Sequence, residues 1–194
     1  MRLENKTIGI LFMNNYYIKE RLLYEIKRLS EIKNVEILPI LENTTSRSNN
    51  KIFRKNINEI NKIAKNKSFL YDKEMDNTQF RKIDVLIVIG FNIELMNQLY
   101  QKNFESSDFF IINYYEKINI PIIIGINGNI DFFSDLNKIK ILLDKKQYYI
   151  IPFLFPNPIT KPNLITFDTS LIIKTTELAL NKVQLKPIIS KSFI

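Results

Sequence analysis

The sequence contains no cysteine, no histidine and no tryptophan, and it has only four glycines in 194 residues. Without cysteine and histidine, the chain cannot build the common zinc sites, iron–sulfur ligand sets, thiol nucleophiles or histidine-based catalytic triads. The absence of cysteine also excludes a small secreted module held together by disulfides. A metal site made only of carboxylates stays possible, although we assign no metal ligand to any residue.

Long hydrophobic runs are also lacking. The isoleucine-rich stretch from residue 118 to 126 is interrupted by Asn119, Pro121 and Gly125, and no run approaches the roughly 18 apolar residues that a membrane-spanning helix needs. The first seven residues have mixed charge and lead into an apolar run too short for the core of a signal peptide. We therefore expect a cytoplasmic protein.

What remains is the composition of a folded, basic protein. Hydrophobic residues make up 45% of the chain, and 28 Lys and Arg against 20 Asp and Glu give a net charge of +8. A chain of this size buries roughly 70% of its unfolded surface, which is enough for a substantial core. The excess charge consists mostly of lysines scattered along the chain, so we do not favour nucleic-acid binding as the main function. We expect one domain over residues 1–194.

Short apolar runs alternate with segments of helical spacing. Runs rich in isoleucine and valine predict strands at residues 7–12, 35–41, 84–90, 109–113, 121–126 and 148–153, with a further short strand at 69–71. Apolar residues spaced by three and four predict helices within 18–29, 52–65, 95–99, 136–143 and 169–182. This alternation predicts a three-layer α/β/α fold, in which a flavodoxin- or Rossmann-like doubly wound parallel sheet lies between helices. The polar interval 42–50 is either a functional loop or a solvated insertion.

The glycines and several asparagines fall where a ligand site would form in such a sheet. Gly9 lies inside the first predicted strand, where a missing side chain lets another backbone or a ligand approach, and Gly90, Gly125 and Gly128 lie at strand ends. Asparagines follow the same strands, at Asn14, Asn15, Asn92, Asn127 and Asn129. In an open α/β sheet, ligands bind beyond the carboxyl ends of the strands. These asparagines are therefore either ligand contacts or helix N-caps.

Neither of the two commonest phosphate-binding motifs is present. No G-x-G-x-x-G follows the first strand, and no P-loop occurs anywhere in the chain. NAD and ATP are therefore disfavoured as ligands of this chain. A mononucleotide pocket that uses amides at a helix N-terminus remains possible.

The most distinctive segment runs from residue 148 to 163 and contains a proline-spaced loop with the pairs Asn157–Pro158 and Lys161–Pro162. A predicted helix and a terminal Gln-Leu-Lys-Pro-Ile at 184–188 follow it. This segment resembles the family of the flavoprotein subunit of dipicolinate synthase, which lies within the homo-oligomeric flavin-containing decarboxylase-like superfamily. The resemblance extends over nearly the whole chain, through segments 6–9, 35–40, 84–88 and 121–126.

The resemblance implies an FMN pocket, homo-oligomerisation and partnership with the NAD(P)-binding subunit of dipicolinate synthase. Together the two subunits would form dipicolinate from a hydroxylated tetrahydrodipicolinate precursor during sporulation, so the substrate would be a small dicarboxylate. Transferred to this sequence, the pattern gives candidate cofactor contacts at Gly9, Asn14, Asn15, Asn92, Asn127, Asn129 and Asn157. Lys161 is the candidate contact to the dicarboxylate, and Tyr16 is a candidate for proton transfer.

The sequence also departs from the family pattern. Tyr16 occupies the position of the family's histidine, and Pro156 replaces the acidic residue before Asn157. Met13 and Glu94 are expected to crowd or repel a flavin phosphate. Two alternatives therefore stay open: a diverged subunit without flavin that serves a structural or interaction role, and an independent flavin-dependent decarboxylase.

Overall fold

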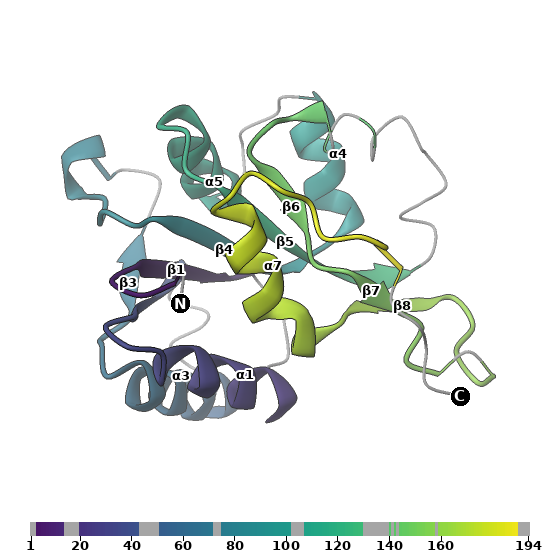
Figure 1. Cartoon of the computed structure of the whole chain (residues 1–194), viewed down its shortest axis with the longest axis horizontal. Coiled ribbons are helices and arrows are strands. Elements are labelled where there is room, and N and C mark those ends of the chain that lie inside the picture. The colour runs from purple at the N-terminus through teal and green to yellow at the C-terminus, as the bar shows by residue number, and fades with distance from the viewer. Residues whose placement is uncertain are drawn as a thin grey trace.

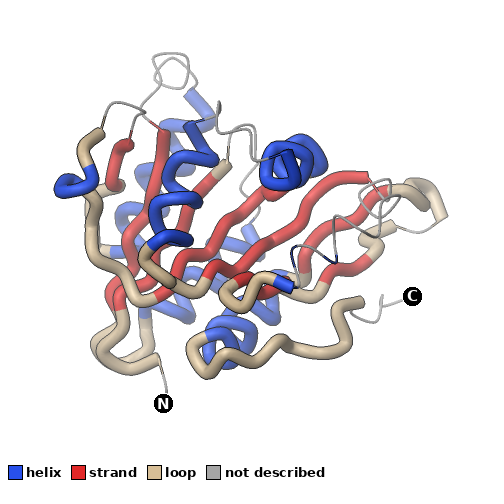
Figure 2. Tube along the Cα trace, turned by 90° about the horizontal axis from the view of Figure 1, so that it is seen from above, coloured by secondary structure: helices blue, strands red, loops and turns tan. Residues whose placement is uncertain are grey.

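The computed structural model describes residues 3–13, 20–42, 51–71, 75–101, 107–129, 140, 142, 144–157 and 159–189. Its strands form one eight-stranded sheet, with helices on both faces (Figure 1, Figure 2). The strands are β1 (Thr7–Phe12), β2 (Glu36–Glu42), β3 (Phe69–Tyr71), β4 (Val85–Phe91), β5 (Ile122–Asn129), β6 (Tyr148–Ile150), β7 (Phe153–Leu154) and β8 (Leu164–Phe167). The helices are α1 (Glu20–Ser30), α3 (Lys51–Ala64), α4 (Ile93–Gln101), α5 (Ser107–Lys117) and α7 (Ile172–Ala179), with 3₁₀ turns η1 (Asn77–Gln79) and η3 (Thr169–Leu171).

The sheet has the predicted doubly wound topology. Strands β3, β2, β1, β4, β5 and β6 lie side by side in this order, and all of these neighbours pair in parallel. The order reverses between β1 and β4, which is where ligands bind in sheets of this kind. The predicted short strand at 69–71 is confirmed as β3 at the edge of the sheet.

The far end of β5 differs from the prediction, because it leaves the parallel sheet and pairs with β8 in antiparallel orientation. Strand β7 then pairs with β8, also antiparallel. The predicted single strand 148–153 is consequently two strands, since Ile151 and Pro152 between β6 and β7 belong to neither. These extra strands widen the sheet beside the carboxyl ends of the parallel strands.

Alternating side chains divide the core into two layers. Ile8, Ile10 and Phe12 pack toward α1, α3 and α7, whereas Leu11 and Met13 pack toward α4 and α5. Each layer is closed by the buried stripe of amphipathic helices, such as Leu22, Ile26 and Leu29 of α1. Because side chains alternate along a strand, the position of a residue in its strand determines the face of the sheet on which its side chain lies.

One predicted strand is wrong. Residues 109–113 belong to α5, in which Phe109, Ile111, Ile112 and Tyr115 are buried against the sheet. A short apolar run does not distinguish a buried strand from a helix that covers a sheet. The predicted helices at 18–29, 52–65, 95–99 and 169–182 correspond to α1, α3, α4 and η3 with α7, and of 136–143 only residues 140 and 142 are described, both helical.

The amino-terminal edge of the sheet is tied together by side-chain hydrogen bonds. The carboxylate of Asp84 accepts from the backbone N–H of Thr7 at 2.8 Å and from the Lys6 ammonium at 2.9 Å, which links the starts of β1 and β4. At the start of β6, the carboxylate of Glu116 accepts from the buried Tyr148 hydroxyl at 2.5 Å and also pairs with Lys145. These contacts join segments far apart in the sequence.

The described helices include none that is long and apolar enough to cross a membrane.

Candidate functional site

The carboxyl ends of β1 and β4 form the point at which the strand order reverses. The backbone N–H of Met13 donates to the Ile89 carbonyl at 3.1 Å, which continues the pairing past the end of β1. Gly90 has a φ of 89°, and the register between β4 and β5 shifts at this residue. Because side chains strain a backbone with this φ, only glycine fits the bulge easily, and the bulge redirects the end of β4.

A pocket of about 270 Å³ lies between the first turn of α1 and strands β7 and β8, on the face covered by α1 and α7. Its lining combines one cation, one carboxylate, two threonine hydroxyls and an apolar wall. The residues are Arg21 of α1, Leu154 of β7, Pro156, Thr166 and Phe167 of β8, Asp168 and Thr169. This mixture of a charged group, hydroxyls and apolar side chains is typical of a small-molecule site.

The predicted residue Asn127 does not belong to the described lining of this pocket, but it pairs with a residue that does. In the antiparallel pairing Asn127 lies opposite Thr166, and on the other side of β8 Thr166 lies opposite Leu154. Paired residues project from the same face, with Cβ atoms about 5 Å apart. Asn127 therefore stands in one row with two lining residues of the pocket.

Asn92 and Asn157 have local structural roles. The side-chain oxygen of Asn92 accepts from the backbone N–H of Leu95 at 3.0 Å, so Asn92 caps α4. The side-chain oxygen of Asn157 accepts from the backbone N–H of Thr160 at 3.1 Å and shapes the turn between β7 and β8. The side-chain oxygens of Asn92 and Asn157 therefore have backbone partners within the fold, in a helix cap and in a turn, without a ligand.

Gly9 has a packing role, which corrects the expectation of a ligand approach at this residue. A Cβ there would lie 2.8 Å from Cδ1 of Ile83 and 3.0 Å from Cδ1 of Ile40, so apolar side chains fill the space. Gly9 alternates with Ile8 and Ile10 and thus faces α4 and α5, on the opposite face of the sheet from the pocket.

The remaining predicted residues are outside the described lining of the pocket or lie outside the described part of the chain. Asn129 is exposed at the last position of β5. Lys161 is exposed in the loop from 155 to 163 and does not belong to the described lining of the pocket. Asn14, Asn15 and Tyr16 lie outside the described residues.

Of the two expected obstacles to a phosphate, Met13 is placed differently from the expectation, whereas the expected repulsion by Glu94 is not tested. Met13 is only 4% exposed and packs in the core toward α4 and α5, so its side chain does not crowd the face that carries the pocket. Glu94 is exposed in the first turn of α4, where a carboxylate interacts favourably with the helix dipole.

Arg21 is a lining residue that sequence reasoning missed. In the sequence it is one polar residue among many on an amphipathic helix, and nothing in its spacing distinguishes it. Its position becomes informative only when β8, which is distant in sequence, is folded beside α1.

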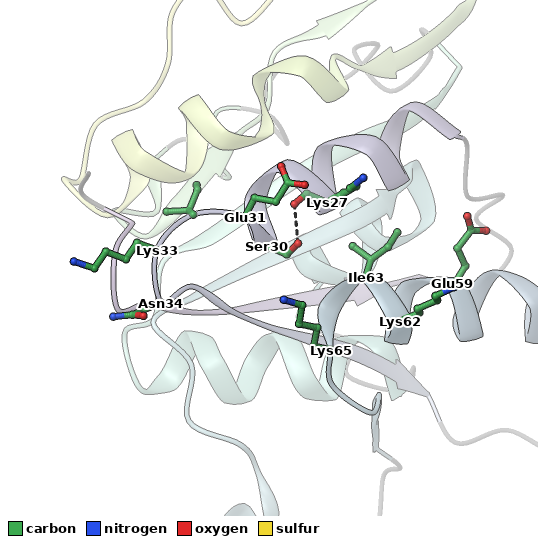
Figure 3. A pocket seen from close by; sticks show the side chains of 10 residues that line it. Lys27, Ser30, Glu31, Lys33, Asn34, Glu59, Lys62, Ile63 and Lys65 are labelled. Atoms are coloured by element: carbon green, nitrogen blue, oxygen red, sulfur yellow. Dashed lines mark hydrogen bonds between the residues drawn. The ribbon is translucent and has the colours of Figure 1, made fainter.

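A larger hollow of about 750 Å³ lies between the last turns of α1 and α3 (Figure 3). Lysines at 27, 33, 62 and 65 and glutamates at 31 and 59 line it. It is on the amino side of the sheet, near the start of β2, and it contains none of the predicted site residues. Lysines at the carboxyl ends of helices are explained by their favourable interaction with the helix dipole.

Within the described residues, no three acidic side chains gather in a group that could hold a metal ion.

Comparison with known proteins identifies the fold. The crystal structure of a dipicolinate synthase subunit from Bacillus halodurans matches with a TM-score of 0.80 and 20% sequence identity, over 100% of both chains. The FMN-dependent cysteine decarboxylase SpaF matches with a TM-score of 0.59 and 9% identity, over 93% of this chain and 99% of that one. A dodecameric FMN-dependent UbiX-like decarboxylase from Escherichia coli O157:H7 matches with a TM-score of 0.54 and 12% identity, over 75% of this chain and 79% of that one. No protein-family model and no curated protein sequence matches.

The chain thus has the three-layer α/β/α fold found in FMN-dependent decarboxylases. Among these structures, it is more similar in fold to the dipicolinate synthase subunit than to the two decarboxylases.

Proposed function

We propose that the chain is a flavoprotein subunit of the dipicolinate synthase type, within the homo-oligomeric flavin-containing decarboxylase-like superfamily. It binds FMN and works with the NAD(P)-binding subunit of that enzyme to form dipicolinate from a hydroxylated tetrahydrodipicolinate precursor during sporulation. The observation that carries this proposal is the similarity in fold to the Bacillus halodurans protein over the full length of both chains. The FMN-dependent decarboxylases with the same fold support the choice of cofactor, and the dodecameric one supports homo-oligomerisation.

The proposal assigns cofactor contacts to the end of β5. Asn127 offers an amide donor and acceptor beside the pocket. Among the described residues, no atom lies within 4 Å of the Cβ that a side chain at Gly128 would have, so this strand end is uncrowded. Asn127 and Asn129, with Asn14 and Asn15 after β1, are the residues proposed to hold FMN. When bound, FMN supplies hydride or electron transfer.

The chain's own groups would orient the substrate and move protons. Without histidine, Tyr16 is the proposed proton donor, and Lys161 is the proposed contact to a carboxylate of the substrate. Lys161 lies in the same exposed loop as Pro156, which lines the pocket. A mobile ammonium there can approach an anion that enters the pocket.

The proposal is tested in two stages. After expression with added riboflavin, the purified protein should show the visible absorption bands of a flavin, and an apoprotein sample should take up added FMN. Turnover of the precursor should then require both this chain and the NAD(P)-binding protein, and Lys161→Ala should reduce it. A colourless protein that takes up no FMN contradicts the cofactor assignment, and turnover by the NAD(P)-binding protein without this chain contradicts the assigned role.

The alternative is a diverged subunit that has the fold without the flavin. The capping role of the oxygens of Asn92 and Asn157 favours it, because these two side chains are explained without a ligand. This alternative predicts no FMN uptake together with stable association with a partner protein, which size-exclusion chromatography of the two proteins measures.

A further inference from the structure

The pocket beside β8 is too small for an entire FMN. Pockets for drug-sized ligands measure roughly 300–1,000 Å³, and this one measures about 270 Å³. A ligand smaller than FMN, such as one substituted ring, is accommodated in this volume. The pocket is therefore smaller than the proposed cofactor requires, although its lining residue Thr166 pairs with Asn127.

The lining determines the chemistry of that ligand. Leu154 and Pro156 provide the apolar surface against which a planar ring can pack, because Phe167 is only 1% exposed. Arg21 provides the one cation of the described lining, and its guanidinium has the forked geometry that pairs with a carboxylate. Thr166 and Thr169 also line the pocket, and a threonine hydroxyl is a group that can donate a hydrogen bond to a further oxygen of the ligand.

Asp168 sets a limit on the charge of the ligand. Its carboxylate accepts from the backbone N–H of Ser170 at 3.1 Å and from the Ser170 hydroxyl at 2.6 Å, so it is oriented within η3. It nevertheless adds a negative charge to the lining, which opposes an anion. Arg21 must therefore supply the attraction that holds an acid in this pocket.

We infer that the pocket of Arg21, Thr166, Phe167 and Thr169 is the subsite for a small planar carboxylic acid, with Arg21 as the residue that selects the carboxylate. The inference rests on the proposed function, since it assigns the substrate side of the same site. It goes further in placing the acid on Arg21 and in separating this subsite from the residues that hold FMN.

The test measures binding of pyridine-2,6-dicarboxylate to the full-length protein by isothermal titration calorimetry, without FMN and without the NAD(P)-binding protein. Arg21→Ala should raise the Kd at least about tenfold, because a hydrogen-bonded charge pair is lost. Arg21→Lys should recover part of the affinity, since it keeps the charge without the fork. Asp168→Asn should lower the Kd, and asparagine preserves the cap of η3.

Two controls locate the effect. The uncharged pyridine-2,6-dicarboxamide should bind much more weakly than the diacid. FMN titrated into Arg21→Ala should bind as it does to the wild-type protein.

The outcomes separate this inference from the proposed function. Loss of diacid binding in Arg21→Ala, with FMN binding retained, supports the inference about the acid subsite. The same loss in a protein that takes up no FMN also supports this inference, and the missing FMN uptake then contradicts only the cofactor assignment. The inference is overturned if the wild-type protein does not bind the diacid, if Arg21→Ala binds it unchanged, or if Arg21→Ala loses FMN instead, because Arg21 would then serve the flavin phosphate.

Discussion

The two edges of the parallel sheet use their polar side chains differently. At the amino edge, Asp84 and Glu116 join separate segments through short hydrogen bonds to Lys6, Thr7 and Tyr148. At the carboxyl edge, polar side chains cap helices, shape a turn or line a pocket. Asp84 and Glu116 thus stabilise the amino edge, whereas Asn92, Asn157 and the pocket residues at the carboxyl edge have local roles or face a cavity.

The largest effect on stability is expected from Glu116→Ala. The substitution leaves the buried Tyr148 hydroxyl without its acceptor and removes the partner of Lys145. An unsatisfied buried polar group typically costs about 1–3 kcal/mol, so we expect the upper end of this range in denaturant unfolding. Glu59→Ala, which alters an exposed acid on α3, should change the free energy of unfolding by less than about 0.5 kcal/mol. Equal effects of the two substitutions would show that the Glu116 contacts do not stabilise the amino edge.

Gly9→Val tests the packing role of this glycine. The added side chain must displace Ile83 and Ile40, and overpacking of this kind costs typically about 1–3 kcal/mol. Thermal or denaturant unfolding measures the loss. Affinity for FMN should stay unchanged, because Gly9 faces the core toward α4 and α5, on the opposite face of the sheet from the proposed contact Asn127. A loss of FMN affinity in a folded Gly9→Val protein would contradict a role in packing alone and would support Gly9 as a cofactor contact.

Asp84 gives the amino edge a predictable dependence on pH. Burial, the largest influence, raises the pKa of the Asp84 carboxyl, but the hydrogen bonds from Thr7 and Lys6 together with the charges of Lys6 and Lys82 outweigh it, so that the pKa is lowered. A lowered pKa means that the stabilisation is present above the unfolded value of about 3.9 and is lost as the pH falls through the folded pKa.

Asp84→Asn should therefore be less stable than the wild-type protein at pH 7, and the difference should shrink as the pH falls below about 4. Unfolding of both proteins by denaturant across this range measures it. A stability difference that stays constant down to the lowest pH would exclude the carboxylate charge as its source.

A smaller effect is expected at the cap of α4. Asn92→Ala should cost about 1 kcal/mol through loss of the bond to Leu95, whereas Asn92→Ser should retain most of the stability because serine also caps. FMN titration of the serine variant then separates the two roles of Asn92. Unchanged affinity identifies a cap alone, and a loss of affinity identifies a residue that also contacts the cofactor.

Part of this architecture is predictable from local patterns. The isoleucine-rich runs predicted β1, β2, β4 and β5 because buried parallel strands have few polar positions. The prediction of a strand at 109–113 failed because burial of α5 against the sheet makes the same run of residues apolar. In both cases the apolar run indicates that the segment is buried. Only its length and its neighbouring residues distinguish a buried strand from a helix that covers the sheet.

The candidate site was less predictable, because it depends on pairings between distant segments. Asn127 was selected for its place after an apolar run, but its neighbour Thr166 comes from an antiparallel strand that the sequence pattern did not indicate. Arg21 carried no local signal at all. A site assembled from α1, β5, β7 and β8 becomes visible only when these segments are folded together.

The most direct test of the account is a fluorescence titration of FMN into the wild-type protein, Asn127→Asp and Asn58→Asp. Both substitutions add one negative charge, the first beside the pocket and the second on the exposed surface of α3. We expect the wild-type protein and Asn58→Asp to bind FMN alike, and Asn127→Asp to bind it at least about tenfold more weakly, since the new charge repels the flavin phosphate. Equal affinities in all three proteins, or no binding in any of them, would contradict the assignment of an FMN site to the carboxyl edge.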